Sequence, residues 1–304
     1  MYKVAALYKF TKILNPFKIH NNIRSKLKNH NVNGTILVGE EGINGTISSN
    51  SKNNLDKAIE FISKLEGFKN LEVKYSFSEK NPFIRLKVKL KKEIVTIGDT
   101  SVDPTKIVGE YVSPAKWNEL IDNKDTIIID TRNNYEYSIG TFKNSLNPKT
   151  SKFREFPNWI KEQKFTKEDK KHKNIAMFCT GGIRCEKASS LMKAQGFDNV
   201  FHLKGGILKY FEDIPEAETR WQGECFVFDN RVAIEHELSA GSYILCNACG
   251  EPLSKVDISS HRYKKGIHCP LCFDNITEEK IQKVTERQKQ IELAKLRGEV
   301  HIGE

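Results

Sequence analysis

The sequence predicts a mixed α/β protein made of an N-terminal α+β domain, a central domain on a parallel sheet, and a C-terminal cysteine-rich segment with a helix. Three observations lead to this prediction. The order of strand and helix patterns changes near residue 98, β-branched strands alternate with helices in the middle, and four cysteines form two pairs near the end. The 304 residues suffice for two or three cores, since single cores usually stop growing by about that length.

Residues 1–98 carry the pattern strand, helix, strand, strand, helix, strand. The expected strands are VAALYKF, GTILVG, GINGTIS and IRLKVKLKKEIVTIG, and the expected helices lie near residues 19–27 and at LDKAIEFISKL. This order is typical of a ferredoxin-like, acylphosphatase-like α+β sandwich. The segment Glu40-Glu41-Gly42-Ile43-Asn44 suits a tight hairpin turn, and a substrate-facing loop is the alternative.

Residues 99–225 carry short β-branched strands that alternate with helices, which predicts βαβ units on a parallel sheet. The strands are expected at TIIIDTR, NIAMFCT and VFHLKGGI. Ser113 and Pro114 should begin a helix over SPAKWNELID, and CEKASSLMKAQG should be an amphipathic helix closed by Gly196. Cys179 therefore lies at the carboxyl edge of the sheet, where α/β proteins bind ligands.

Residues 226–304 form the third predicted part. FVFDNRVAI predicts two short strands. The stretch TEEKIQKVTERQKQIELAKLRGE predicts a long charged helix that is basic towards its end, with Thr277 as its N-cap. A solvated tail helix is the favoured interpretation, and a helix along RNA is the alternative.

The loop CTGGIRCEK carries the candidate catalytic residues Cys179 and Arg184. The candidate anion-binding loop consists of Thr180, Gly181, Gly182 and Ile183. Its two glycines let successive backbone N–H groups turn towards one point in front of a helix, which should lower the thiol pKa and stabilise a thiolate or persulfide. Arg184 adds a positive charge. The alternative is an inert thiol that ends a core strand.

Four residues separate Cys179 from Arg184, as in the sulfur-handling rhodaneses, whereas cysteine phosphatases of the rhodanese-like fold have five. A second segment also resembles the rhodanese signature, with Asp130, Thr131, Arg132, Glu136, Gly140, Phe142, Ser145, Asn147 and Pro148. The resemblance implies that Asp130, Arg132 and Glu136 support the domain rather than react. Cys185 can resolve a persulfide or disulfide on Cys179, although a buried helix residue is favoured.

Two CxxC pairs follow, Cys246 with Cys249 and Cys269 with Cys272, separated by 19 residues. This spacing predicts a four-cysteine zinc-ribbon-like site, because each turn directs two thiolates at one tetrahedral centre. A redox pair or a site without metal is the alternative. The nearby His261 and His268 are expected at the surface, since four thiolates complete the coordination shell.

The chain has 49 basic and 39 acidic residues, a formal charge of +10, which suits a polyanionic partner or simply a lysine-rich surface. The candidate RNA contacts are Lys87, Lys89, Lys91 and Lys92. No export signal or apolar membrane segment is visible in the sequence, so we expect a cytoplasmic protein with all seven cysteines reduced or metal-bound. No dinucleotide-binding glycine motif or facial-triad metal motif appears either.

Long segments resemble the oxygen-dependent tRNA uridine hydroxylase family, whose members contain a rhodanese domain. They are GEEGINGT at 39–46, PFIRLKVKLKKEIVTIG at 82–98, CTGGIRCEK, GECFVFDNRVAI and C-x-A-C-G-x-P-L-S. The resemblance implies hydroxylation of carbon five of the tRNA wobble uridine, with molecular oxygen as co-substrate. It also implies that Cys179 is the active-site cysteine that forms a persulfide. No motif identifies the electron donor, the set of tRNAs, a protein partner or the oligomeric state.

The residues by themselves favour a different chemistry. A persulfide in an anion-binding loop is a good sulfur donor, so the bottom-up prediction is a rhodanese-type sulfurtransferase. A third hypothesis is an RNA-binding module with a vestigial rhodanese domain, and the intact Cys179 and Arg184 disfavour it.

Overall fold

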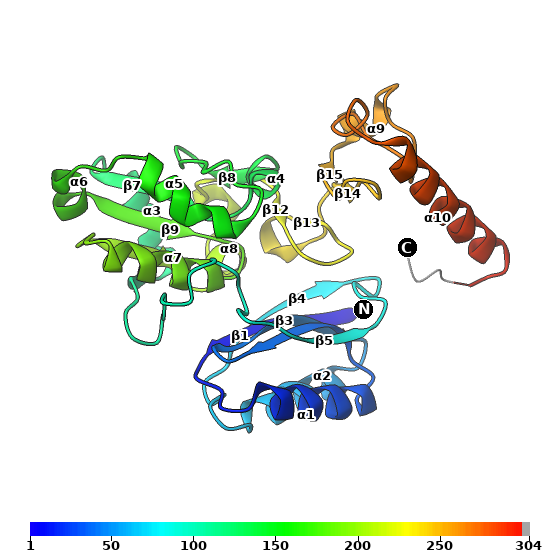
Figure 1. The fold of residues 1–304 in the computed structure, drawn as a ribbon, viewed down its shortest axis with the longest axis horizontal. Helices are drawn as coiled ribbons and strands as arrows, with labels where there is room; N and C mark the ends of the chain where they lie inside the picture. Colours follow the sequence, from blue (N-terminus) through cyan, green and yellow to red (C-terminus); the bar gives the residue numbers. More distant parts are fainter. Residues whose placement is uncertain (300–304) are drawn as a thin grey trace. The chain divides into compact units, whose positions relative to one another are not determined.

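The computed structural model describes residues 1–299 (Figure 1), so the last five residues of the predicted third part lie outside the described residues. The chain forms two compact units. The first comprises Met1–Asn230 with Glu235–Ser239, and the second comprises Arg231–Ile234 with the chain from Ala240 onward. The N-terminal and central parts thus belong to one unit. The domain boundaries after residues 98 and 225 stay predictions.

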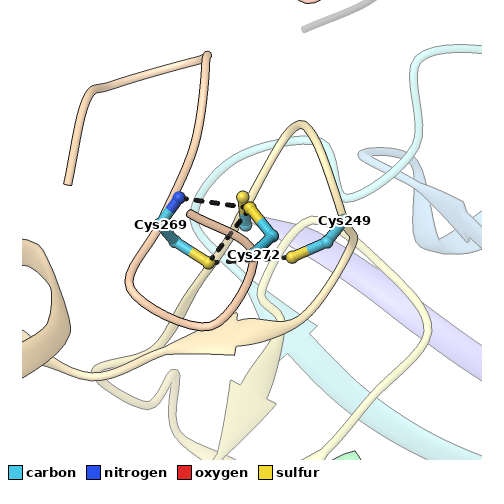
Figure 2. Close-up of side chains that lie close together, drawn as sticks. Cys249, Cys269 and Cys272 are labelled. Atoms are coloured by element: carbon cyan, nitrogen blue, oxygen red, sulfur yellow. Dashed lines mark hydrogen bonds between the residues drawn. The ribbon is translucent and has the colours of Figure 1, made fainter. Parts of the chain in front are cut away.

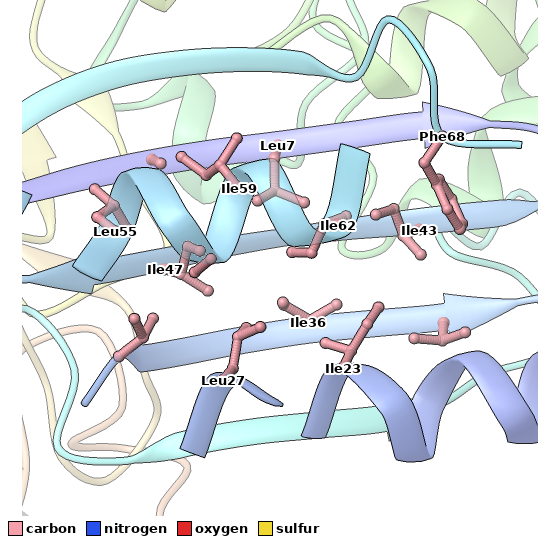
Figure 3. Close-up of a cluster of buried hydrophobic side chains, with 14 of the residues drawn as sticks. Leu7, Ile23, Leu27, Ile36, Ile43, Ile47, Leu55, Ile59, Ile62 and Phe68 are labelled. Carbon is pink, nitrogen blue, oxygen red and sulfur yellow. The ribbon is translucent and has the colours of Figure 1, made fainter. Parts of the chain in front are cut away.

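The N-terminal part is a five-stranded sheet with both of its helices on one face (Figure 1). Its elements are β1 (Tyr2–Phe10), α1 (Pro16–Asn29), β2 (Asn33–Gly39), β3 (Gly42–Ser49), α2 (Lys52–Ser63), β4 (Glu72–Ser78) and β5 (Leu86–Leu90). The strand order is β4-β1-β3-β2-β5, and only β5 runs parallel to its neighbour β2. Figure 3 shows the core between helices and sheet, which includes Ile23, Ile36, Ile47 and Leu55.

One strand prediction in this part is wrong. The segment 84–98 was expected to be the fourth strand of the sandwich, but that strand is β4, and only Leu86–Leu90 is extended, as a fifth strand at the other edge. The β4 sequence EVKYSFS lies at an edge of the sheet and alternates polar and apolar residues. This period of two is typical of a strand, so β4 was recognisable from the sequence. The ferredoxin-like order of the first four strands is as predicted.

The central part contains the predicted parallel sheet, ordered β6-β10-β9-β7. Its elements are β6 (Glu110–Val112), α3 (Pro114–Asp122), β7 (Thr126–Asp130), α4 (Asn134–Tyr137), β8 (Gly140–Phe142), η1 (Phe153–Glu155), α5 (Phe156–Glu162), α6 (Lys167–His172), β9 (Asn174–Phe178), α7 (Ile183–Ala194), β10 (Val200–Leu203), α8 (Gly206–Asp213), η2 (Glu216–Glu218), β11 (Trp221–Gly223) and β12 (Cys225–Phe226). Ser113 precedes α3 as predicted. The predicted fold class is confirmed.

Helix α7 differs from the prediction, because it is buried on nearly all sides rather than amphipathic. Every residue from Arg184 to Met192 is buried. One side packs on β9 and β10, and the other side meets the N-terminal part. There the Lys187 ammonium lies 2.7 Å from a Glu41 carboxylate oxygen and 2.6 Å from one of Glu93. Glu40 and Glu41 form the two-residue turn between β2 and β3, and Gly42, Ile43 and Asn44 already belong to β3. Glu41 joins the two parts through Lys187.

The second unit has little regular structure besides its terminal helix. Its elements are β13 (Ala233–Ile234), β14 (Ile244–Leu245), β15 (Pro252–Leu253), α9 (Lys255–Ser259) and α10 (Glu278–Leu296), while η3 (His236–Leu238) belongs to the first unit. The Thr277 side chain accepts a hydrogen bond from the Lys280 N–H and caps α10 as predicted. Among residues 1–299, no helix is long and apolar enough to cross a membrane.

Candidate functional site

Cys179 follows the last residue of β9 and is completely buried. The backbone N–H of Gly182 donates a hydrogen bond to its sulfur at 3.1 Å. Gly182 has φ +99°, a left-handed conformation that glycine adopts without strain, and it begins helix α7. A methyl group on Gly206 would stand 2.5 Å from the Cys179 carbonyl oxygen. The backbone at Gly206 can therefore lie this close to Cys179 only because the residue is glycine. The sequence therefore builds a tight loop around the sulfur.

This loop stabilises the thiolate form of Cys179. Burial alone raises the pKa of a thiol. Here a hydrogen bond from the Cys185 thiol, the charge of Arg184 and the backbone N–H groups of Cys185 and Arg184 outweigh burial and hold the pKa of Cys179 below its ordinary value. The pKa of Cys185 is raised by burial and by the neighbouring Cys179. The pair therefore carries one thiolate, on Cys179, as the anion-binding loop predicts.

Replacing Cys185 by alanine should raise the pKa of Cys179, because the thiolate would lose a hydrogen-bond donor. Thiolate absorbance at 240 nm, followed against pH, measures this directly. The thiolate signal disappears as pH falls through the pKa, so the curve of the variant should shift to higher pH. The difference between the wild type and Cys179→Ser identifies the Cys179 signal. An unchanged curve would contradict the role of Cys185 as a donor.

Arg184 is fixed by a buried carboxylate rather than left free. Its guanidinium donates two hydrogen bonds to Glu136, at 2.6 and 2.8 Å, and a third to Thr180 Oγ1 at 3.3 Å. Burial raises the pKa of Glu136, but Arg184 outweighs burial, and that pKa is held below its usual range. A paired charge of this kind offsets the cost of burial. Glu136 therefore holds Arg184 in a fixed orientation. The sequence predicted only that Glu136 supports the domain.

Asp130 and Arg132 form a second buried ion pair. The Arg132 guanidinium donates to both Asp130 carboxylate oxygens, with the shortest contact at 2.7 Å, and also to the Gly140 carbonyl. Both side chains are completely buried. The Arg132 guanidinium also lies over the rings of Phe178 in β9 and Trp221 in β11. These contacts support the interpretation that the pair braces the domain.

Several residues beside the thiol were not identified from the sequence. A cavity of about 440 Å³ lies in the first unit, with walls from both of its domains. It is lined by Tyr8, Lys9, Phe10, Glu72, Pro104, Thr105, Tyr111, Glu186 and Lys204. The Tyr8 hydroxyl donates a hydrogen bond to Glu186 at 2.8 Å, although 178 positions separate them. No local pattern in the sequence relates residues this far apart.

The four cysteines of the CxxC pairs lie together in the second unit. Figure 2 shows three of them, Cys249, Cys269 and Cys272, with their sulfur atoms turned towards one another. All four sulfur atoms are within 4.8 Å of one another, and Cys269 lies 3.7 Å from both Cys249 and Cys272. Tetrahedral zinc with bonds of about 2.3 Å separates its sulfur ligands by about 3.8 Å. Cys246, Cys249, Cys269 and Cys272 can therefore hold a metal ion.

The remaining candidates differ in exposure. Lys87, Lys89, Lys91 and Lys92 are all exposed, on β5 and just after it. His261 is exposed, and His268 is half-buried with its Nδ1 2.9 Å from the Arg262 carbonyl oxygen. Neither histidine belongs to the four-cysteine group, as predicted.

The fold and the thiol loop define a class: a rhodanese-domain protein with an acylphosphatase-like N-terminal domain. The profile of the UPF0176 acylphosphatase like domain matches residues 2–94, and that of the rhodanese-like domain matches residues 113–213. A curated relative is the tRNA uridine(34) hydroxylase of Teredinibacter turnerae, 48% identical over 303 residues, which span 100% of this chain and 93% of the relative. The chain belongs to the tRNA uridine(34) hydroxylase family, as the resemblance implied.

Solved structures show weaker similarity to parts of the chain. A rhodanese-related protein from Thermoplasma volcanium is 23% identical, over 35% of this chain and 95% of its own, with a TM-score of 0.27. An acylphosphatase from Bacillus subtilis is 10% identical, over 30% of this chain and 99% of its own, with a TM-score of 0.24. Neither similarity is strong enough to extend a function to this protein.

Proposed function

We propose that this protein is a cytoplasmic tRNA modification enzyme that hydroxylates carbon five of the wobble uridine, position 34, with molecular oxygen. The observation that carries the proposal is the 48% identity over the whole chain to a relative named tRNA uridine(34) hydroxylase. The thiol loop of the rhodanese domain supports it, because its lowered thiol pKa is typical of a reactive cysteine rather than a structural one.

Cys179 is the reactive residue in this proposal, as a thiolate or as the persulfide made from it. The Gly182 N–H and the charge of Arg184 stabilise the anion, and Glu136 and Thr180 hold Arg184 in place. The role of Arg184 is electrostatic, so its loss should weaken the reaction less than loss of the thiol. The four cysteines of the second unit hold zinc in a structural role, since four thiolates leave no open position for a substrate.

Sulfur transfer is the second candidate function, and one observation favours it. The loop between Cys179 and Arg184 has the four-residue length of sulfur-handling rhodaneses, and it stabilises an anionic sulfur. The same loop would serve a persulfide that delivers sulfur to uridine. The two functions therefore share a site and differ in the product.

Isotopic oxygen separates these two products. We expect tRNA from a strain lacking the enzyme, incubated with the protein and a thiol reductant under ¹⁸O-labelled oxygen gas, to gain one labelled oxygen atom in its wobble uridine. The reductant supplies the two electrons that convert the other oxygen atom to water. The tRNA is digested to nucleosides and analysed at high mass resolution, because adding oxygen and replacing oxygen by sulfur raise the nominal mass equally. The label should be absent when oxygen is excluded.

The matched control is the same reaction without oxygen but with a sulfane donor such as thiosulfate. Incorporation of sulfur under those conditions would replace the hydroxylase proposal by a sulfurtransferase. Absence of any modification in both reactions, with the tRNA still bound, would favour the RNA-binding module instead.

A further inference from the structure

The cavity lined by Tyr8 and Glu186 adjoins the thiol loop. The Glu186 N–H donates to the Gly182 carbonyl at 3.3 Å, and the Gly182 N–H donates to the Cys179 sulfur. The Tyr8 hydroxyl lies 3.2 Å from the position that a methyl group on Gly182 would occupy. Glu186, which lines the cavity, is thus hydrogen-bonded to Gly182, and Gly182 in turn donates to the reactive sulfur.

Aromatic rings form much of the cavity wall. Tyr8 and Phe10 come from β1 and pack edge to face, while Tyr111 comes from β6 and is half-exposed at the opening. Flat rings around a space of about 440 Å³ suit a planar ligand, because nucleobases stack on such rings, and this volume lies within the usual range for a small-molecule site. The lining also carries two lysines, Lys9 and Lys204, alongside two glutamates, and a lysine ammonium can bind the phosphate attached to a base.

Glu186 is the polar group at the inner wall. Burial is the main cause that raises its pKa, the nearby Glu72 raises it further, and Tyr8, Tyr111 and Lys74 only partly oppose this. The carboxyl therefore favours its neutral form more than an ordinary glutamate does. One oxygen accepts the Tyr8 hydrogen bond. A carboxyl group can accept hydrogen bonds in either protonation state.

We propose that this cavity binds the target uracil base of the tRNA, with Glu186 accepting a hydrogen bond from the base and the aromatic side chains stacking on the ring. This inference rests on the proposed function, and it names a site for the base beside the thiol loop. Uracil carries an N–H at ring position three, whereas cytosine has an unprotonated acceptor nitrogen there. An acceptor at this edge therefore favours uracil.

The place of the base is tested by photocrosslinking. An anticodon stem-loop RNA with 5-bromouridine at the wobble position is bound to Cys179→Ser, which cannot carry out the reaction, and is irradiated. We expect crosslinks to Tyr8, Phe10 or Tyr111, identified by mass spectrometry of the peptides. Tyr75 lies outside the cavity lining and is exposed on β4, so it is the control aromatic residue of the same domain. Crosslinks confined to Tyr75 or to other residues outside the cavity would overturn the proposal.

The role of Glu186 is tested by two substitutions. Glu186→Gln keeps a donor and an acceptor and should retain activity within about threefold, whereas Glu186→Leu should lower kcat/KM for tRNA about tenfold, as expected for a lost buried hydrogen bond. The 240 nm titration of Cys179 should be similar in the two variants, and melting temperatures identify a folding defect. Equal losses in the Glu186→Gln and Glu186→Leu variants, when both fold, would overturn the hydrogen-bonding role of Glu186.

These outcomes separate the inference from the proposed function. Crosslinks in the cavity together with no labelled oxygen in the product would leave the base site standing and reject hydroxylation. Labelled oxygen in the product together with crosslinks elsewhere would keep the function and reject the site.

Discussion

Replacing Cys179 by serine should abolish tRNA modification and leave the fold intact. Serine fits the same buried space and can still accept the Gly182 hydrogen bond, but its hydroxyl does not ionise in this loop and cannot form a persulfide. Loss of a nucleophile lowers enzymatic rates by about 10³-fold or more. The measurement is modified uridine per tRNA after digestion, together with the melting temperature of the variant.

Cys225→Ser is the matched control for this experiment. Cys225 is also completely buried in the central part, but burial raises its pKa to about 12, so it carries no thiolate at neutral pH. Its replacement should leave activity near the wild-type level. A Cys179→Ser protein that modifies tRNA at a near wild-type rate would refute the assignment of the reactive residue.

Removing the metal should unfold the cysteine-containing segment of the second unit. We expect one zinc per chain by elemental analysis of protein purified without chelators, and its loss in Cys269→Ala. The buried cluster there is built from Cys246, Leu253 and Cys269, so little apolar surface holds this segment without metal. Structural zinc contributes about 10–16 kcal/mol of apparent binding free energy in small zinc domains. Limited proteolysis after chelation should therefore cut within residues 246–272.

His268→Ala is the control, because His268 lies in the same segment but outside the sulfur cluster, and the variant should keep its zinc. Less than about a tenth of an equivalent of zinc, with all four thiols freely alkylated, would favour a redox or degenerate site.

The sequence predicted the parts of the site that are contiguous along the chain. Strand, glycine pair, arginine and helix follow one another from residue 174 onward, so the spacing alone indicated a reactive thiol. Partners far apart in sequence were not predictable in this way. Glu136 lies 48 positions from the arginine it holds, and Tyr8 lies 178 positions from Glu186. Only the folded chain brings these pairs together.

The two errors in the fold have different causes. The β4 sequence EVKYSFS alternates polar and apolar residues and could have been recognised as a strand, but the longer lysine-rich segment 84–98 was taken as the fourth strand instead. Helix α7 carries Arg184, Glu186 and Lys187, which in an isolated sequence indicate a solvent-facing side. Side chains from other segments cover that side instead. They are Glu136 on Arg184, Tyr8 on Glu186, and Glu41 and Glu93 on Lys187.

The buried Lys187 limits how freely the two domains of the first unit can be separated. Its ammonium is completely buried against the carboxylates of Glu41 and Glu93, which both lie in the N-terminal part. Loss of one partner from a buried ion pair costs about 3–5 kcal/mol, a large fraction of the stability of a typical domain. A rhodanese domain expressed without the N-terminal part would therefore carry this charge unpaired on its surface helix and should be less stable than the same domain in the full chain.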